Sequence, residues 1–308
     1  MFNFCANIFG YLLEFLYNIV NNYGLAIILF TILIKLLLLP LSIKQQRATQ
    51  KNAKIQEELK VIQFKYKNDP EKMNQEMMQL YKQENMSPFS GCFTAIIQFV
   101  LILSIFYLVK SPLTYMEKIS TEDINKYITQ LQEEGKISSS VYPEIDVIRE
   151  YNWLKEKNPE DSQLDKVNLK MDFLGLDLSK VPQQNMSDYT VYIIPILYII
   201  SSFISIRMTT KMQEKQQNSK KKQASNNQTV IDGETGKELI PNEDEKIDEM
   251  EALMQTNKMM SWMMPIMSIS IAFVAPLGLA LYWLISNILM ILERIVLNKT
   301  IKTGEEQE

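Results

Sequence analysis

Residues 24–44 read GLAIILFTILIKLLLLPLSIK and decide what kind of protein this is. Between Leu25 and Ile43 the only ionisable side chain is that of Lys35. A run of this length comes close to the ~20 apolar residues that a helix needs to cross the hydrocarbon core of a bilayer. We therefore predict a membrane span that carries a lysine near its middle. A charge at that depth is costly, and it usually serves a function.

The rest of the chain repeats this alternation of apolar and charged blocks. Its mean hydropathy of -0.09 averages over both kinds of block and says little by itself. Five apolar runs are candidate spans, although the fourth is short for a full crossing. They predict an all-α membrane protein with five transmembrane helices, at residues 25–43, 89–111, 189–209, 258–275 and 276–298.

Two amphipathic segments flank the first span. Residues 1–24 place Asn7 and Glu14 opposite Phe9 and Leu13 at helical spacing, which predicts an interfacial helix outside the membrane. A sixth span is the alternative for this segment.

Residues 44–88 predict a cytosolic helical hairpin, because Asp69 can cap a second helix that starts at Pro70. A simple connecting loop is the alternative there. The remaining segments are predicted as an external loop with short helices at 112–188, a partly disordered cytosolic loop at 210–257 and a cytosolic tail at 299–308.

The charges of the connecting segments predict the orientation. Residues 44–88 hold 9 Lys and Arg against 6 Asp and Glu, whereas residues 113–188 hold 9 against 15. Positive loops stay in the cytosol, so we expect the N-terminus outside and the C-terminus on the cytosolic side of the membrane. Residues 1–24 contain no Lys or Arg, which argues against a secretory signal.

The composition excludes most catalytic chemistry. The chain has no histidine, which removes histidine-based triads and most zinc sites. Cys5 and Cys92 are the only cysteines, and the expected topology puts them at opposite faces of the membrane. We therefore predict a protein that is not an enzyme, with no catalytic residues, no metal and no cofactor.

Polar residues of several spans fall at similar depth, in the middle or the cytosolic half of the membrane. If the helices face one another, these side chains line a polar cavity open to the cytosol, which would make Lys35 tolerable. The candidate lining residues on these grounds are Lys35, Thr94, Gln98, Ser201, Ser205, Ser286 and Asn287. The alternative is that Lys35 snorkels to the headgroups or pairs with Glu293. Pairing is disfavoured because Glu293 lies roughly 6 Å from the inner boundary and Lys35 roughly 12 Å from it.

Several ordered motifs carry a family resemblance. The run from Gly24 to Gln45 is followed by Lys65-Tyr66-Lys67-Asn68-Asp69-Pro70 and Ile97-Gln98-Phe99, then by Phe173-Leu174-Gly175, Trp262-Met263-Met264-Pro265 and Leu281-Tyr282-Trp283. In this order they resemble the YidC/Oxa1/Alb3 membrane-protein insertases, in the form found in Gram-positive bacteria.

The resemblance implies an insertase and chaperone that inserts and folds membrane proteins. In that family a positive residue in a hydrophilic groove, open to cytosol and lipid, attracts acidic segments of the substrate. Lys35 stands at the position of that residue, where the family usually has arginine, and Gln98 and Trp283 match other groove residues. The implied partners are nascent membrane proteins, the lipid bilayer, the general secretion translocon and the ribosome, with no direct nucleic acid. A small anion or solute transporter and a structural membrane scaffold are the rival functions.

Overall fold

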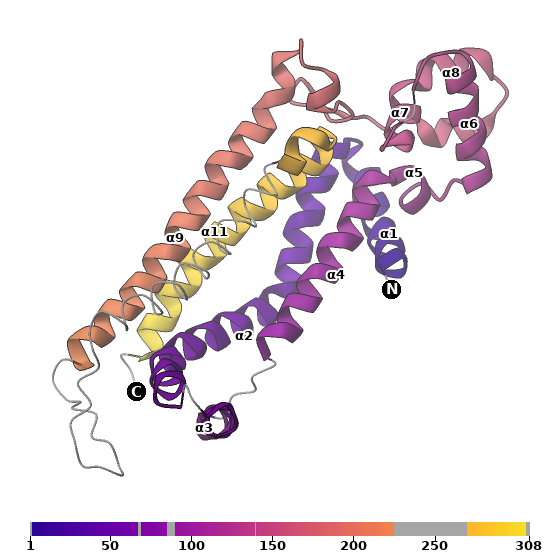
Figure 1. The fold of residues 1–308 in the computed structure, drawn as a ribbon. Helices are drawn as coiled ribbons and strands as arrows, with labels where there is room; N and C mark the ends of the chain where they lie inside the picture. Colours follow the sequence, from indigo (N-terminus) through magenta and orange to yellow (C-terminus); the bar gives the residue numbers. More distant parts are fainter. Residues whose placement is uncertain (1, 67–68, 85–89, 139, 225–269, 306–308) are drawn as a thin grey trace, which may run out of the picture.

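The computed structural model describes residues 2–66, 69–84, 90–138, 140–224 and 270–305, and these residues are mostly helical (Figure 1). The first part of the chain forms α1 (Phe2–Val20), α2 (Tyr23–Lys65), α3 (Pro70–Gln83) and α4 (Ser90–Lys110). A group of short elements follows: α5 (Pro112–Tyr115), α6 (Thr121–Glu133), α7 (Pro143–Arg149), α8 (Tyr151–Lys157), η1 (Ser162–Val167), β1 (Asp172–Phe173), β2 (Leu176–Asp177), η2 (Pro182–Gln184) and η3 (Tyr189–Tyr192). Two long helices end the described chain, α9 (Ile193–Ala224) and α11 (Leu277–Glu305).

Three helices of the described residues are long and apolar enough to cross a membrane, at Tyr23–Arg47, Tyr189–Met208 and Leu277–Leu297. The prediction of a helical membrane protein is therefore confirmed. α4 corresponds to the expected span at 89–111, and Phe99–Lys110 forms a shorter apolar helix within its described part. Most of the expected span at 258–275 lies outside the described residues, so the number of five spans stays a prediction.

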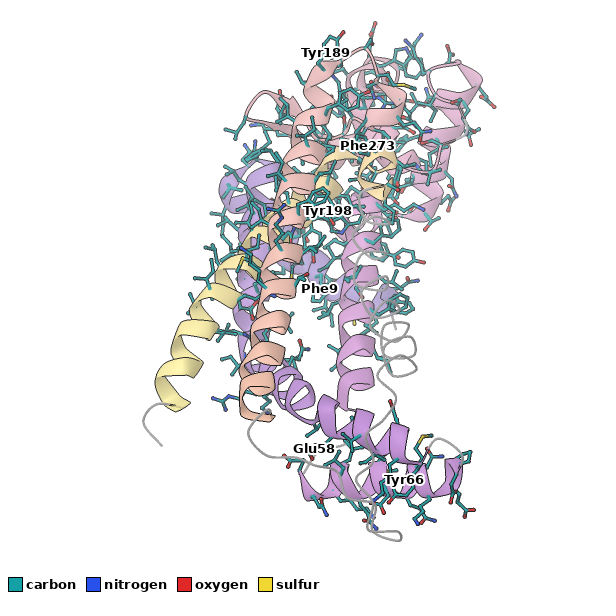
Figure 2. The ribbon with its side chains drawn as sticks, turned by 60° about the vertical axis from the view of Figure 1, so that its left-hand side comes forward. Phe9, Glu58, Tyr66, Tyr189, Tyr198 and Phe273 are labelled. Atoms are coloured by element: carbon teal, nitrogen blue, oxygen red, sulfur yellow. The ribbon has the colours of Figure 1, made fainter. Side chains whose placement is uncertain are left out.

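The helix α2 continues without a break from the apolar run into the charged segment and is 43 residues long. Pro40 lies inside it, where a proline removes one backbone hydrogen bond and favours a bend. Figure 1 shows α2 changing direction along its length. The second half of α2 packs against α3 through Ile55, Leu59 and Leu80, and Asp69 caps α3 by accepting the Lys72 N–H at 3.0 Å. This pair lies at the end of the molecule opposite Tyr189 (Figure 2).

The long helices lie alongside one another, with α11 between α9 and α2 (Figure 1). The helix α1 packs across α4 and α2. It buries Ala6, Gly10 and Leu13, with Gly10 against the backbone of Tyr115 in α5, and leaves Phe4 and Phe15 exposed on its outer face. Exposed aromatic side chains on an amphipathic helix are typical of contact with a membrane interface.

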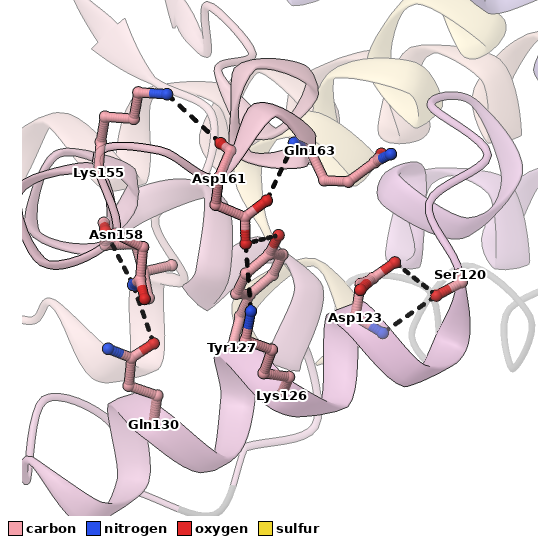
Figure 3. A network of polar contacts seen from close by, with 10 residues as sticks. Ser120, Asp123, Lys126, Tyr127, Gln130, Lys155, Asn158, Asp161 and Gln163 are labelled. Carbon is pink, nitrogen blue, oxygen red and sulfur yellow. Dashed lines mark hydrogen bonds and ion pairs between the residues drawn. The ribbon is translucent and has the colours of Figure 1, made fainter.

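The short helices after α4 form a packed unit with its own polar network (Figure 3). Asp161 accepts hydrogen bonds from Tyr127 Oη at 3.0 Å, Lys126 Nζ at 3.3 Å and the Gln163 N–H at 3.0 Å. Burial raises the pKa of Asp161, but these donors outweigh it and hold the pKa below its usual range. Glu144 ties α7 to α5 by accepting from the Thr114 N–H at 3.0 Å and Thr114 Oγ1 at 2.7 Å.

Not all of the expected helical loop at 112–188 is helical, because β1 and β2 form an antiparallel hairpin with Phe173 opposite Leu176. This hairpin and its flanks hold the start of two spanning helices. The Tyr23 N–H donates to the Lys170 carbonyl at 3.0 Å, and the Leu277 N–H donates to the Lys180 carbonyl at 2.9 Å. The first N–H groups of a helix have no partner within it, so each of these bonds satisfies an orphan donor.

Candidate functional site

A buried amide joins the two spanning helices α9 and α11. Asn287 Nδ2 donates to Ser201 Oγ at 3.0 Å and lies 3.1 Å from Ser202 Oγ. Ser201 Oγ itself donates to the Tyr198 carbonyl at 2.8 Å. The side chain of Asn287 would be costly to bury without partners, so these bonds explain how an apolar helix carries it. We call the side chains of Asn287, Ser201, Ser202 and Ser205 the serine seam.

Arg294 continues the serine seam one step along α11. Its Nη1 donates to Ser205 Oγ at 3.4 Å, and it follows Asn287 by seven residues. Seven residues are close to two helical turns, so both side chains extend from one face of α11. Arg294 was not among the site residues predicted from the sequence, because it lies near the expected end of its span.

Lys35 lies on α2, which packs against α11. The lysine is partly buried and lies within electrostatic range of both Glu293 and Arg294. Among the residues that the structure describes, it forms no ion pair. Two cations and one carboxylate therefore lie within electrostatic range of one another near the contact of α2 with α11, and this charge cluster of Lys35, Glu293 and Arg294 carries a net positive charge.

The carboxylate of this cluster has an oxygen without a hydrogen-bond donor in the described part of the chain. Glu293 Oε1 is buried and accepts no hydrogen bond within the described part of the chain. A carboxylate oxygen without a partner in a site of low polarity is costly. The long-range attraction of Lys35 and Arg294 is the compensation that the structure provides.

Aromatic side chains border the serine seam on the side toward the start of α11. The rings of Tyr198 and Trp283 lie 6.1 Å apart, within the range of a favourable ring contact. Tyr282 and Ser286 lie four residues apart on α11, so both extend from one face of that helix. Of the two, Tyr282 is buried and Ser286 is partly exposed.

The structure thus places most of the expected site residues, but not all. Ser201, Ser205 and Asn287 come together in the serine seam, and Lys35 lies beside the Glu293 and Arg294 pair. Thr94 and Gln98 lie on α4, and their side chains are outside the described part of the structure. In the described part of the chain, no group of three or more His, Cys, Asp or Glu side chains could hold a metal ion.

A comparison with known proteins identifies the family of this chain. The family model of the 60Kd inner membrane protein matches residues 15–305. This chain belongs to that family. The match includes all three candidate spans and every residue of the serine seam and the charge cluster.

Several proteins that are similar to this chain share one name. A protein of Treponema denticola named membrane protein insertase YidC is 25% identical over 292 residues, 95% of this chain and 37% of that protein. Proteins with the same name from Clostridium perfringens and Clostridium tetani are 44% identical over 105 and 98 residues, which are 34% and 30% of this chain and 44% of each relative. The chain thus spans less than half the length of these relatives.

Proposed function

We propose that this protein is a membrane protein insertase and chaperone, in keeping with the names of its relatives. The observation that carries the proposal is the charge cluster, which sets Lys35 and Arg294 against the single carboxylate of Glu293 between spanning helices. The cluster holds two cations and one carboxylate, so one positive charge is in excess there. It is suited to attract an acidic segment that enters temporarily.

The residues perform this task through electrostatics and solvation. Moving a polar segment into a bilayer costs several kcal/mol because hydrocarbon offers no hydrogen bonds. The serine seam and the charge cluster replace part of the lost water for that segment, and Lys35 supplies attraction. Glu293 competes with the substrate for the two cations, so the substrate is held weakly and released. No covalent step is required, so the proposed activity is not an enzymatic one.

An apolar substrate segment needs a different surface, and α9 and α11 provide it. Large apolar side chains are exposed on α9 at Ile196, Leu197, Ile200, Phe203 and Ile204, and on α11 at Ile288, Leu292, Ile295 and Val296. We assign this surface to the hydrophobic part of the substrate. The path of this substrate segment would be bordered on its polar side by Thr94, Gln98, Ser286 and Trp283.

The pairing of α2 with α3 would receive substrates or partner proteins on the cytosolic side. This assignment rests on the positive excess of residues 44–88, which favours a cytosolic position, with the N-terminus outside and the C-terminus inside. The general secretion translocon and the ribosome are the partners proposed for this face.

Replacing Lys35 by Gln, Arg and Glu tests the function. The assay is insertion of a single-span protein with an acidic external tail into vesicles that contain the purified chain. We expect Lys35→Arg to retain activity, Lys35→Gln to lose about fivefold, equivalent to ~1 kcal/mol, and Lys35→Glu to lose more. Lys44→Gln is the matched control, because it removes the same charge from an exposed position of the same helix.

The outcomes separate the possible functions. Equal insertion by all three Lys35 variants would refute the electrostatic role. Solute flux through the vesicles that depends on Lys35, without insertion, would indicate a transporter. Crosslinking of a nascent membrane protein to positions 98 and 283 would show that the substrate passes the proposed surface.

A further inference from the structure

The tip of the β1–β2 hairpin is unusual in both backbone and side chain. Leu174 has φ 52° and Gly175 has φ 77°, so both central residues of the turn are left-handed. Asn-Gly or Asp-Gly is favoured in such turns, because a bulky residue at positive φ is strained by about 1–2 kcal/mol. Leu174 is also 86% exposed, more than any other large apolar residue of the described chain. Neither the turn nor water favours leucine at this position.

The hairpin lies at the level where two spanning helices begin. Asn22 Nδ2 donates to the Asp172 carbonyl at 2.6 Å, immediately before α2. On the other flank, the Gly278 N–H at the start of α11 donates to the Leu178 carbonyl at 3.0 Å. Phe173 packs directly on Gly24. These contacts hold the hairpin at the boundary between the apolar spans and the polar unit of short helices.

Further apolar side chains are exposed beside the hairpin. The strand β2 lies next to η3, where Tyr189 is 85% exposed. Met186 precedes η3 and is also exposed. Tyrosine is typical of the interface between headgroups and hydrocarbon, and the exposed apolar surface continues from η3 into Ile193 and Leu197 of α9. The hairpin tip is therefore an outlying part of a surface that leads into the spans.

We propose that Leu174 inserts into the lipid leaflet that surrounds the first turns of α2, α9 and α11. Lipid is the partner that fits, because the tip is apolar, lies at the span boundary and adjoins an interfacial tyrosine. Transfer of the leucine side chain from water into that layer offsets the strain of its backbone. The hairpin then anchors the unit of short helices to the bilayer, independently of the insertase activity proposed above.

Site-specific fluorescence in the full chain tests this contact. Cys5 and Cys92 are replaced by Ser, and a polarity-sensitive dye is attached at Leu174→Cys or, as the matched control, at Gln163→Cys, an exposed polar position of η1. Both proteins are reconstituted into phosphatidylglycerol and phosphatidylethanolamine vesicles with nitroxide lipids. The same dye at both positions controls for its own affinity for lipid, and thermal unfolding of the labelled proteins checks the fold.

We expect blue-shifted emission at position 174 and loss of most of it to nitroxides near the headgroups, with little loss to aqueous iodide. The dye at position 163 should show the reverse. Iodide quenching at position 174 equal to that at 163 would overturn the proposal. A photoreactive residue at position 174 provides the second measurement. Crosslinks to lipid support lipid insertion, whereas crosslinks mainly to a protein, either a substrate or a second copy of the chain, overturn it.

Discussion

Asn287 of α11 lies 3.0 Å from Ser201 of α9, and this hydrogen bond connects two helices that are each apolar enough to span a membrane. Both side chains are buried. Between such helices there is little hydrophobic force, so packing and hydrogen bonds decide how they associate. Among the helices that the structure describes, α9 and α11 also have the most extensive contact.

Replacing Asn287 by Ala should therefore destabilise the helix pair. We expect a loss of about 1 kcal/mol, since hydrogen bonds between membrane helices contribute ~0.6 kcal/mol on average and up to ~1.7. Denaturation of the protein in mixed micelles measures this change. Asn18→Ala, at an exposed position of α1, is the control and should have little effect. Equal stability of the two variants would contradict a structural role for the serine seam.

Removing the carboxylate of the charge cluster should strengthen the binding of an acidic substrate. Glu293→Gln removes the carboxylate that competes with substrate for Lys35 and Arg294, so an acidic substrate should be held longer. We expect the substrate to remain able to crosslink to position 283 for about fivefold longer, which corresponds to ~1 kcal/mol of added attraction. A substrate without acidic residues serves as the control. A shorter lifetime with the acidic substrate would show that Glu293 supports binding instead.

Glu117 predicts a pH dependence at the contact between α1 and the loop before α6. Burial raises its pKa from 4.5 to about 7, with Glu14 of α1 adding repulsion and Lys166 opposing it. The folded state therefore binds the proton more tightly than the unfolded state, and stability falls as the pH rises from 4.5 to 7. Glu117→Gln should remove this loss and stabilise the protein at pH 8, by on the order of 1 kcal/mol because solvent screens the partly exposed carboxylate.

Thermal unfolding at pH 5 and pH 8 measures this difference. The benefit of Glu117→Gln should shrink toward the acidic end. Glu133→Gln, at an exposed position of α6, provides the comparison. An equal benefit at both pH values would exclude titration of Glu117 as the cause.

The two glycines at the second position of α2 and α11 form a matched pair. A Cβ on Gly24 would lie 2.5 Å from Phe173 Cγ, whereas a Cβ on Gly278 would have its nearest neighbour, Tyr23 Cε1, at 3.4 Å. We expect Gly24→Ala to destabilise the protein by about 1–3 kcal/mol, as overpacking usually does, and Gly278→Ala to be tolerated. Thermal unfolding measures both effects. The combination of Gly24→Ala with Phe173→Ala should recover part of the loss, and strict additivity of the two changes would argue against the contact.

The spans were predictable because uninterrupted apolar runs have few alternative structures. The helices at Tyr23–Arg47, Tyr189–Met208 and Leu277–Leu297 all fall on such runs. Asn287 and Ser201 were predictable as site residues for a related reason, since polar side chains inside an apolar run need partners. Their helical spacing did not by itself reveal which two helices they join.

Other features had no comparable signal. Strands of two residues, such as Asp172–Phe173, are too short to show alternation, and Leu174 stands where a turn residue such as Asn is expected. Arg294 lies close to the predicted end of its span, where a charge reads as a membrane boundary. Only the approach of α9 and α2 to that part of α11 shows that it belongs to the charge cluster.

The unbroken course of α2 has a mechanical consequence. At 1.5 Å per residue, its 43 residues measure roughly 65 Å along the helix. The β1–β2 hairpin contacts one end, Lys35 lies along its length, and α3 packs near the other end. The helix that packs against α3 is therefore the same continuous helix that carries Lys35. Pro40 lies between the two, where its missing backbone hydrogen bond makes the helix less stiff.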